Sequence, residues 1–176
     1  MSEAIKSLFS ETDMQVNLTP IINGEVKELP FSFTQSVSDE AAGIYFKGLD
    51  LTPAGDMEVS GKVSDISGFY ELDCMIRLPY ETHCSRCGAP VTDVCVCEMH
   101  RIVSAEAERG DDEGYIIYAD RALLLDGPVY EELSIGFPSK PLCKTDCRGL
   151  CPICGRDLNE GDCEHSHANN NETDTL

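Results

Sequence analysis

The chain has 176 residues and a formal charge of −19 at pH 7, because 13 Lys and Arg side chains face 32 Asp and Glu side chains. Its length fits one domain with a small appendage. So negative a charge repels a phosphate backbone, which argues against DNA binding and against an extended RNA-binding face and favours basic protein partners.

The first 70 residues contain no cysteine and predict a β-rich platform. Apolar residues alternate with polar ones over residues 14–18, 31–33 and 57–63, the period of two that is typical of strands with one buried face. Near the start of the chain, Glu3 and Glu11 interrupt any apolar stretch, so no secretory signal is expected. No stretch approaches the roughly 18 consecutive apolar residues of a membrane span. We therefore expect a cytoplasmic protein with reduced thiols and no membrane partner.

The clearest predicted strand runs from Tyr70 to Tyr80, where every second side chain is apolar. It leads into the tight turn Cys84-Ser-Arg-Cys87-Gly-Ala-Pro90, after which residues 91–103 alternate again. This pattern predicts a long antiparallel hairpin whose tip is a CxxC motif. The next segment, residues 105–114, holds five acids and one Arg and predicts a solvated loop.

The remaining elements are a short strand at 115–118 and a helix at 126–137, with Pro128 near its start and Pro138 as a stop. The predicted class is α+β, a mainly antiparallel sheet platform with a helix and a cysteine-rich zinc-binding C-terminal module. We divide the chain into a platform that carries the CxxC hairpin, a cysteine-rich metal-binding module, and a disordered acidic and polar tail. These three parts cover residues 1–139, 140–165 and 166–176.

Two segments share one local design, Cys84-Ser-Arg-Cys87-Gly and Cys151-Pro-Ile-Cys154-Gly. In each, a tight turn aims two thiolates at one cation, and the glycine tolerates the positive φ that such a turn often needs. A redox dithiol would instead be expected in a βαβ context, which neither segment has. Both segments therefore favour metal binding, each supplying half of a tetrahedral site.

The C-terminal cluster adds Cys143, Cys147, Cys163 and His165 to the second of these pairs. It holds more potential ligands than one zinc ion can use. A local site would take Cys147 or Cys143 with the 151/154 pair and Cys163. Alternatively, the 151/154 pair could join the 84/87 pair across the fold, leaving the other cysteines for a second ion or for none. The spacing leaves both arrangements open.

A metal in this module is expected to be structural. Only four sizeable aliphatic side chains lie in residues 140–165, whereas a cysteine-rich zinc site contributes on the order of 10 kcal/mol. Four thiolates also leave no open position for a catalytic water. The remaining candidates are interpreted as follows: Cys74 as a core residue, Cys95 and Cys97 as same-face residues that reach a metal only if their strand bends back, and His83 as a solvated residue.

The module is locally basic. Residues 140–156 carry Lys140, Lys144, Arg148 and Arg156 against one acid, Asp146. These cations balance the negative charge of a thiolate cluster, or together with Arg86 they form a small phosphate-contacting patch.

Residues 141–155, PLCKTDCRGLCPICG, followed by DLNEGDC at 157–163, closely resemble the C-terminal signature of the bacterial YceD-like family. This family is also called domain of unknown function 177 or the large ribosomal RNA subunit accumulation protein family. The CSRC at 84–87 resembles its central CxRC, and residues 128–138 resemble the helix before the terminal motif. The resemblance covers residues 55–165, about two thirds of the chain.

The resemblance implies a role in accumulation of large-subunit ribosomal RNA and in ribosome biogenesis, with zinc suggested by the cysteines and no enzymatic activity. His165 stands where the family motif has a further cysteine, and imidazole is a competent zinc ligand. The cysteines of this chain that fall on the motif, and that we take as candidate metal ligands, are Cys84, Cys87, Cys143, Cys147, Cys151, Cys154 and Cys163.

The hypothesis from the sequence is a non-catalytic zinc-binding factor that supports 23S ribosomal RNA accumulation by binding a basic ribosomal or assembly protein. Any direct RNA contact would be confined to the small cationic patch. One alternative is a rubredoxin-like iron electron carrier, because CPICG is also the knuckle of such sites. A second is a thiol redox or metal-delivery protein that uses the surplus cysteines. Nucleotide-binding, zinc-protease and hydrolase motifs do not occur.

Overall fold

A computed structural model describes residues 14–105 and 115–165 of the chain. The predicted tail at 166–176 and nearly all of the predicted loop at 105–114 lie outside the described residues, as do Glu3 and Glu11. The described part is an α+β fold with a mostly antiparallel sheet and few helices, which confirms the α+β class and the mainly antiparallel sheet of the prediction.

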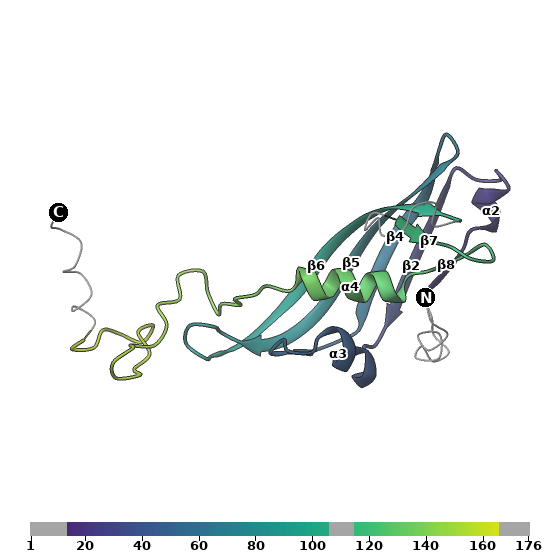
Figure 1. Ribbon diagram of the computed structural model, residues 1–176. Coiled ribbons are helices and arrows are strands. Elements are labelled where there is room, and N and C mark those ends of the chain that lie inside the picture. The colour runs from purple at the N-terminus through teal and green to yellow at the C-terminus, as the bar shows by residue number, and fades with distance from the viewer. Residues whose placement is uncertain (1–13, 106–114, 166–176) are drawn as a thin grey trace, which may run out of the picture.

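A six-stranded sheet forms the body of the molecule (Figure 1). Its strands are β2 (Glu28–Gln35), β3 (Leu51–Pro53), β4 (Met57–Ile66), β5 (Phe69–His83), β6 (Pro90–Ser104) and β7 (Tyr115–Ile117). The spatial order is β2-β4-β5-β6-β7, and β3 pairs with the C-terminal end of β5. All pairings are antiparallel except that of β6 with β7, which is parallel.

The predicted hairpin is confirmed and dominates the sheet. Strands β5 and β6 are each 15 residues long and stay paired from Tyr70 opposite Val103 to His83 opposite Pro90. Unbroken pairing carries the CxxC of the tip well beyond the body of the sheet (Figure 1).

A second, two-stranded sheet joins the two ends of the described platform. Strand β1 (Gln15–Asn17) pairs antiparallel with β8 (Ala122–Leu124). The backbone N–H of Met14 donates a buried 2.9 Å hydrogen bond to Asp126 Oδ2, which holds this sheet to the start of the following helix. Neither β8 nor the short helix α2 (Thr19–Ile22) was predicted from the sequence.

Helix α4 (Asp126–Gly136), which confirms the predicted helix, packs against β6 on one face of the sheet, with α3 (Asp39–Tyr45) beside it (Figure 1). The alternation along β4, β5 and β6 directs their apolar side chains to this face. Fully or almost fully buried members of the resulting core are Val59, Val63, Leu72, Ile76, Leu78, Met99, Val129 and Leu133.

Gly61 interrupts the apolar face of β4 for a packing reason. A Cβ atom on Gly61 would lie 2.1 Å from the backbone oxygen of Asp73 and 2.9 Å from the ring of Phe31. Strand β5 and the aromatic side chain from β2 occupy the space of a side chain, so only glycine fits here.

We expect Gly61→Ala to lower the free energy of unfolding by about 1–3 kcal/mol, because the added methyl group forces backbone and ring apart. Gly43→Ala is the matched control, since Gly43 is exposed in α3 with nothing within 4 Å of an added Cβ. That variant should be neutral or more stable by up to about 1 kcal/mol. Urea unfolding of the two variants measures both values, and equal stabilities would contradict the packing role of Gly61.

Candidate metal centre

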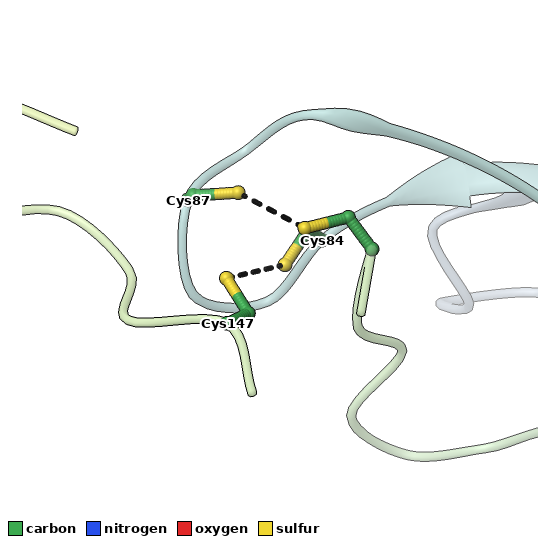
Figure 2. A group of neighbouring side chains, drawn as sticks. Cys84, Cys87 and Cys147 are labelled. Carbon is green, nitrogen blue, oxygen red and sulfur yellow. Dashed lines mark hydrogen bonds between the residues drawn. The ribbon is translucent and has the colours of Figure 1, made fainter. Parts of the chain in front are cut away.

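Four cysteines meet where the hairpin tip faces the chain after α4. Cys84 and Cys87 come from the tip, and Cys143 and Cys147 come from the segment that follows the helix. Figure 2 shows the sulfur atoms of Cys84, Cys87 and Cys147 turned toward one another. The Sγ atoms of Cys84 and Cys147 lie 3.7 Å apart, and those of Cys87 and Cys143 lie 3.6 Å apart.

A second group gathers within the C-terminal segment itself and consists of Cys151, Cys154, Cys163 and His165. We call the two groups the first cluster and the second cluster. In each, the four ligand atoms lie within 4.8 Å of one another. Among residues 14–105 and 115–165, these are the groups of His, Cys, Asp and Glu side chains compact enough to hold a metal ion.

Both clusters are built on the same knuckle. In the first, the Gly88 N–H donates to the Cys84 carbonyl at 2.8 Å; in the second, the Gly155 N–H donates to the Cys151 carbonyl at 2.9 Å. Both glycines have a φ of +73°, a conformation that a side chain disfavours. The two CxxCG segments therefore share one turn geometry, as their sequences indicate.

The spacing of the sulfur atoms fits a tetrahedral ion. Zinc–thiolate bonds of about 2.3 Å imply sulfur–sulfur separations of about 3.8 Å in a tetrahedron, close to the 3.6 and 3.7 Å of the first cluster. A disulfide would require about 2.05 Å, and all ten cysteines are free. Four sulfur atoms that converge at this distance suit a metal ion better than a disulfide bond.

In the second cluster, His165 gives a separate observation that fits a bound cation. Its Nδ1 atom is buried and has no hydrogen-bond partner among the described residues. An unpaired buried nitrogen costs free energy, and a cation bound by the three neighbouring thiolates would satisfy it. The sequence places His165 two residues after Cys163, but the set of candidate ligands drawn from the cysteine motif omitted it.

The structure places all seven candidate cysteines in the two clusters. Their grouping differs from both arrangements considered from the sequence. The 84/87 pair meets Cys143 and Cys147, and the 151/154 pair meets Cys163 and His165. The path of the chain explains the grouping. The Ser85 N–H donates to the Pro141 carbonyl at 2.9 Å, which lays the segment after α4 along the hairpin tip.

The thiols of the first cluster do not ionise alike in the metal-free protein. Burial opposes ionisation of Cys84, but hydrogen bonds from the backbone of Cys143, Arg86 and Cys87 prevail and lower its pKa to about 6. Burial and the neighbouring thiols raise the pKa of Cys143 to about 12. The cluster therefore stabilises one negative charge and penalises further ones, a balance that a cation would reverse.

The second cluster follows the same rule. Backbone hydrogen bonds from Cys154 and Ile153 lower the pKa of Cys151 to about 7. Burial raises the pKa of Cys163, and the thiol of Cys151 adds to the rise. In each knuckle the first cysteine therefore ionises more readily than an ordinary thiol.

The three remaining cysteines belong to the core. Cys74, Cys95 and Cys97 are buried beneath α4, in agreement with the interpretation of Cys74. The strand of Cys95 and Cys97 does not bend back toward the tip; the two sulfur atoms lie 3.6 Å apart, and Cys97 Sγ lies 3.9 Å from the Glu132 carbonyl. His83 is exposed, 3.4 Å from Asp50, as expected for a solvated residue.

Two of the basic residues near the clusters serve the module itself. Arg86 donates from Nη1 to the Cys147 carbonyl at 2.7 Å, and Arg148 pairs with Asp162. Lys140, Lys144 and Arg156 are exposed.

Comparison with known protein families agrees with the resemblance that the cysteine motif indicates. The family described as large ribosomal RNA subunit accumulation protein YceD matches residues 72–175, which include the hairpin and both clusters. The chain belongs to the YceD family.

Curated relatives of this chain include uncharacterised proteins of Mycobacterium bovis and of two strains of Mycobacterium tuberculosis. Each is 26% identical over 105 residues, which is 56% of this chain and 50% of the relative. The chain thus spans about half the length of the curated relatives it matches. No solved structure matches the chain. Within the described residues, no helix has the length and apolar character needed to cross a membrane.

We expect Cys74 and Cys95 to resist alkylation at pH 7.5 even after chelation, whereas the exposed Cys154 reacts. Burial raises the pKa of both core thiols to about 12, so their thiolate fraction is roughly a thousandfold below that of an ordinary cysteine. Mass spectrometry of peptides after a timed iodoacetamide reaction reports each site. Labelling of Cys74 or Cys95 at the rate of Cys154 would contradict this expectation, because it would show that the core of the platform unfolds in the chelated protein.

Proposed function

We propose that this YceD protein is a non-catalytic zinc-binding factor that supports accumulation of large-subunit (23S) ribosomal RNA. In this proposal it acts in large-subunit biogenesis by binding a basic ribosomal or assembly protein. Membership of a family described by large ribosomal RNA subunit accumulation is the observation that carries the proposal.

Zinc is the metal that both ligand sets accept. Four thiolates, or three thiolates and an imidazole, are the usual ligands of structural zinc. Four thiolates could also hold iron as in rubredoxin, but His165 makes the second cluster a poorer match to such a site. With four protein ligands each, neither cluster keeps an open position for substrate or water, which supports a structural role. Bound zinc would supply a cross-link and no reactive group.

The need for that cross-link follows from the poor core of the module. Leu150 and Ile153 are 45% and 63% exposed, so they bury little apolar surface. The first cluster joins the hairpin tip to residues about 60 positions later in the chain. Because the loop that it closes is long, a metal bond here would remove much conformational entropy from the unfolded chain. Metal free energy would replace the missing hydrophobic core.

The outer face of the sheet supports the choice of a basic partner. On the side of β5 and β6 away from α4, the exposed side chains include the acids Asp73, Glu81 and Glu98 and one base, Arg77, beside the apolar Met75 and Val96. Exposed aliphatic side chains among carboxylates suit a partner that presents basic and apolar groups together. The overall charge of −19 would attract such a partner over a distance.

We expect the purified full-length protein to be colourless and to hold two zinc ions per chain. Because each cluster needs all four ligands, Cys84→Ser and Cys163→Ser should each lose one ion, whereas Cys74→Ala should keep both. Elemental analysis counts the metal, and circular dichroism checks that the sheet is retained. Iron with visible thiolate absorption, or a metal content unchanged by the cluster variants, would contradict the assignment.

In cells, depletion of the protein should lower mature 23S ribosomal RNA relative to the small-subunit RNA. Wild-type protein and Cys74→Ala should restore the ratio, while Cys84→Ser should not, because the module would lose its cross-link to the hairpin. Normal 23S levels after depletion would refute the biogenesis role. Capture of the tagged protein, analysed for basic ribosomal proteins and RNA together, distinguishes protein binding from direct RNA binding.

A further inference from the structure

One side chain bridges the two clusters. Asn159 lies in the segment of the second cluster, between Cys154 and Cys163, yet its side chain reaches the first cluster. Its Nδ2 group donates to Cys147 Sγ at 3.4 Å, a normal length for a hydrogen bond to sulfur. A residue that belongs to one cluster in sequence thus contacts a ligand atom of the other.

The orientation of the Asn159 amide is fixed by its other neighbours. Its Oδ1 accepts from the Arg148 N–H at 2.9 Å, and its Nδ2 also donates to Asp157 Oδ1 at 2.7 Å. A flipped amide would place its oxygen against a carboxylate and a thiol sulfur and its NH₂ group against a backbone donor. The network therefore permits one orientation, with the donor directed at the sulfur of Cys147.

The backbone docks the two segments together at the same place. The Leu150 N–H donates to the Arg86 carbonyl at 3.1 Å, and the Leu158 N–H donates to the Gly149 carbonyl at 2.9 Å. Gly149 has a φ of +73°, and a Cβ on it would lie 3.0 Å from the Arg86 oxygen. Leu150, the residue after Gly149, pairs with Asp157 in an isolated antiparallel β-bridge. The close approach of Gly149 to Arg86 thus attaches the turn of the first cluster to the segment that carries Asn159.

We propose that Asn159 is a positioning residue of the first metal site and couples the two sites, so that they fill cooperatively. An N–H group directed at a metal-bound thiolate stabilises its charge and fixes its direction. Asn159 can do so only when its own segment is folded, and metal in the second cluster folds that segment. Filling the second site therefore raises the affinity of the first.

Coupling of this kind acts in both directions. If the second metal strengthens the first site by a given factor, the first metal strengthens the second site by the same factor. Partly loaded chains should then be less common than two independent sites would give. The inference rests on the proposed metal binding and adds to it a residue that is not a ligand.

Titration of the metal-free full-length protein with Co²⁺ tests the coupling, since sulfur-to-cobalt absorption reports thiolate ligation and Zn²⁺ competition gives affinities. Two variants remove the donor: Asn159→Leu, and Asn159→Asp, which keeps the acceptor for the Arg148 N–H. We expect each to weaken the first site by about 10-fold or more, the effect typical of residues that orient metal ligands. Glu160→Gln, a change at the exposed neighbour, should bind as wild type.

The same titration with Cys163→Ser as background isolates the coupling. With the second site disabled, the first site should already be weak, and Asn159→Asp should weaken it by less than about threefold more, so the two effects are not additive. Wild-type affinity of both Asn159 variants, or additive effects, would overturn the coupling while leaving metal binding intact. Failure of the wild-type protein to bind Co²⁺ or Zn²⁺ would overturn the metal proposal and the coupling with it.

Discussion

The placement of the C-terminal module depends on four sulfur atoms that meet beyond the end of the sheet. Two 15-residue strands carry Cys84 and Cys87 outward, and the chain after α4 brings Cys143 and Cys147 to them. Both halves of this contact lie where little apolar surface can be buried. In the proposed zinc protein, metal–thiolate bonds would take the place of a hydrophobic core in the C-terminal module.

The platform and the module are stabilised by different physics. The platform buries its apolar side chains between the sheet and α4, and its three cysteines behave there as small apolar residues. The module holds its cysteines by knuckle turns, with backbone N–H groups directed at sulfur. Cysteine therefore has two roles in one chain, and the surroundings of each thiol decide which role it takes.

Local sequence patterns predicted the elements whose signals are local. Alternation located β4, β5 and β6, and the prolines bounded α4. The helix α3 was missed although Ser38 caps it by accepting from the Ala41 N–H, because its seven residues include a glycine and offer little apolar periodicity. Strand β8 was missed because its partner β1 lies more than 100 residues earlier in the chain.

The metal ligands were predictable as residues but not as sites. The CxxCG motifs identify the knuckles, whereas the grouping depends on the path of the chain between α4 and Cys143, which follows from tertiary packing. The sequence already placed His165 where the family motif has a cysteine, and its unpaired buried nitrogen beside three thiols is what the structure adds.

The tight contact of α4 with β6 sets a mechanical condition on the first cluster. Gly136 sits so close to Cys97 that an added Cβ would lie 2.2 Å from its sulfur, which fixes the end of the helix on the strand. From Cys97 to Pro90 the strand rises about 23 Å, and the seven residue steps from Gly136 to Cys143 span at most about 25 Å. The segment from Gly136 to Cys143 is therefore short relative to the hairpin, so the position of α4 on the sheet limits where Cys143 can lie.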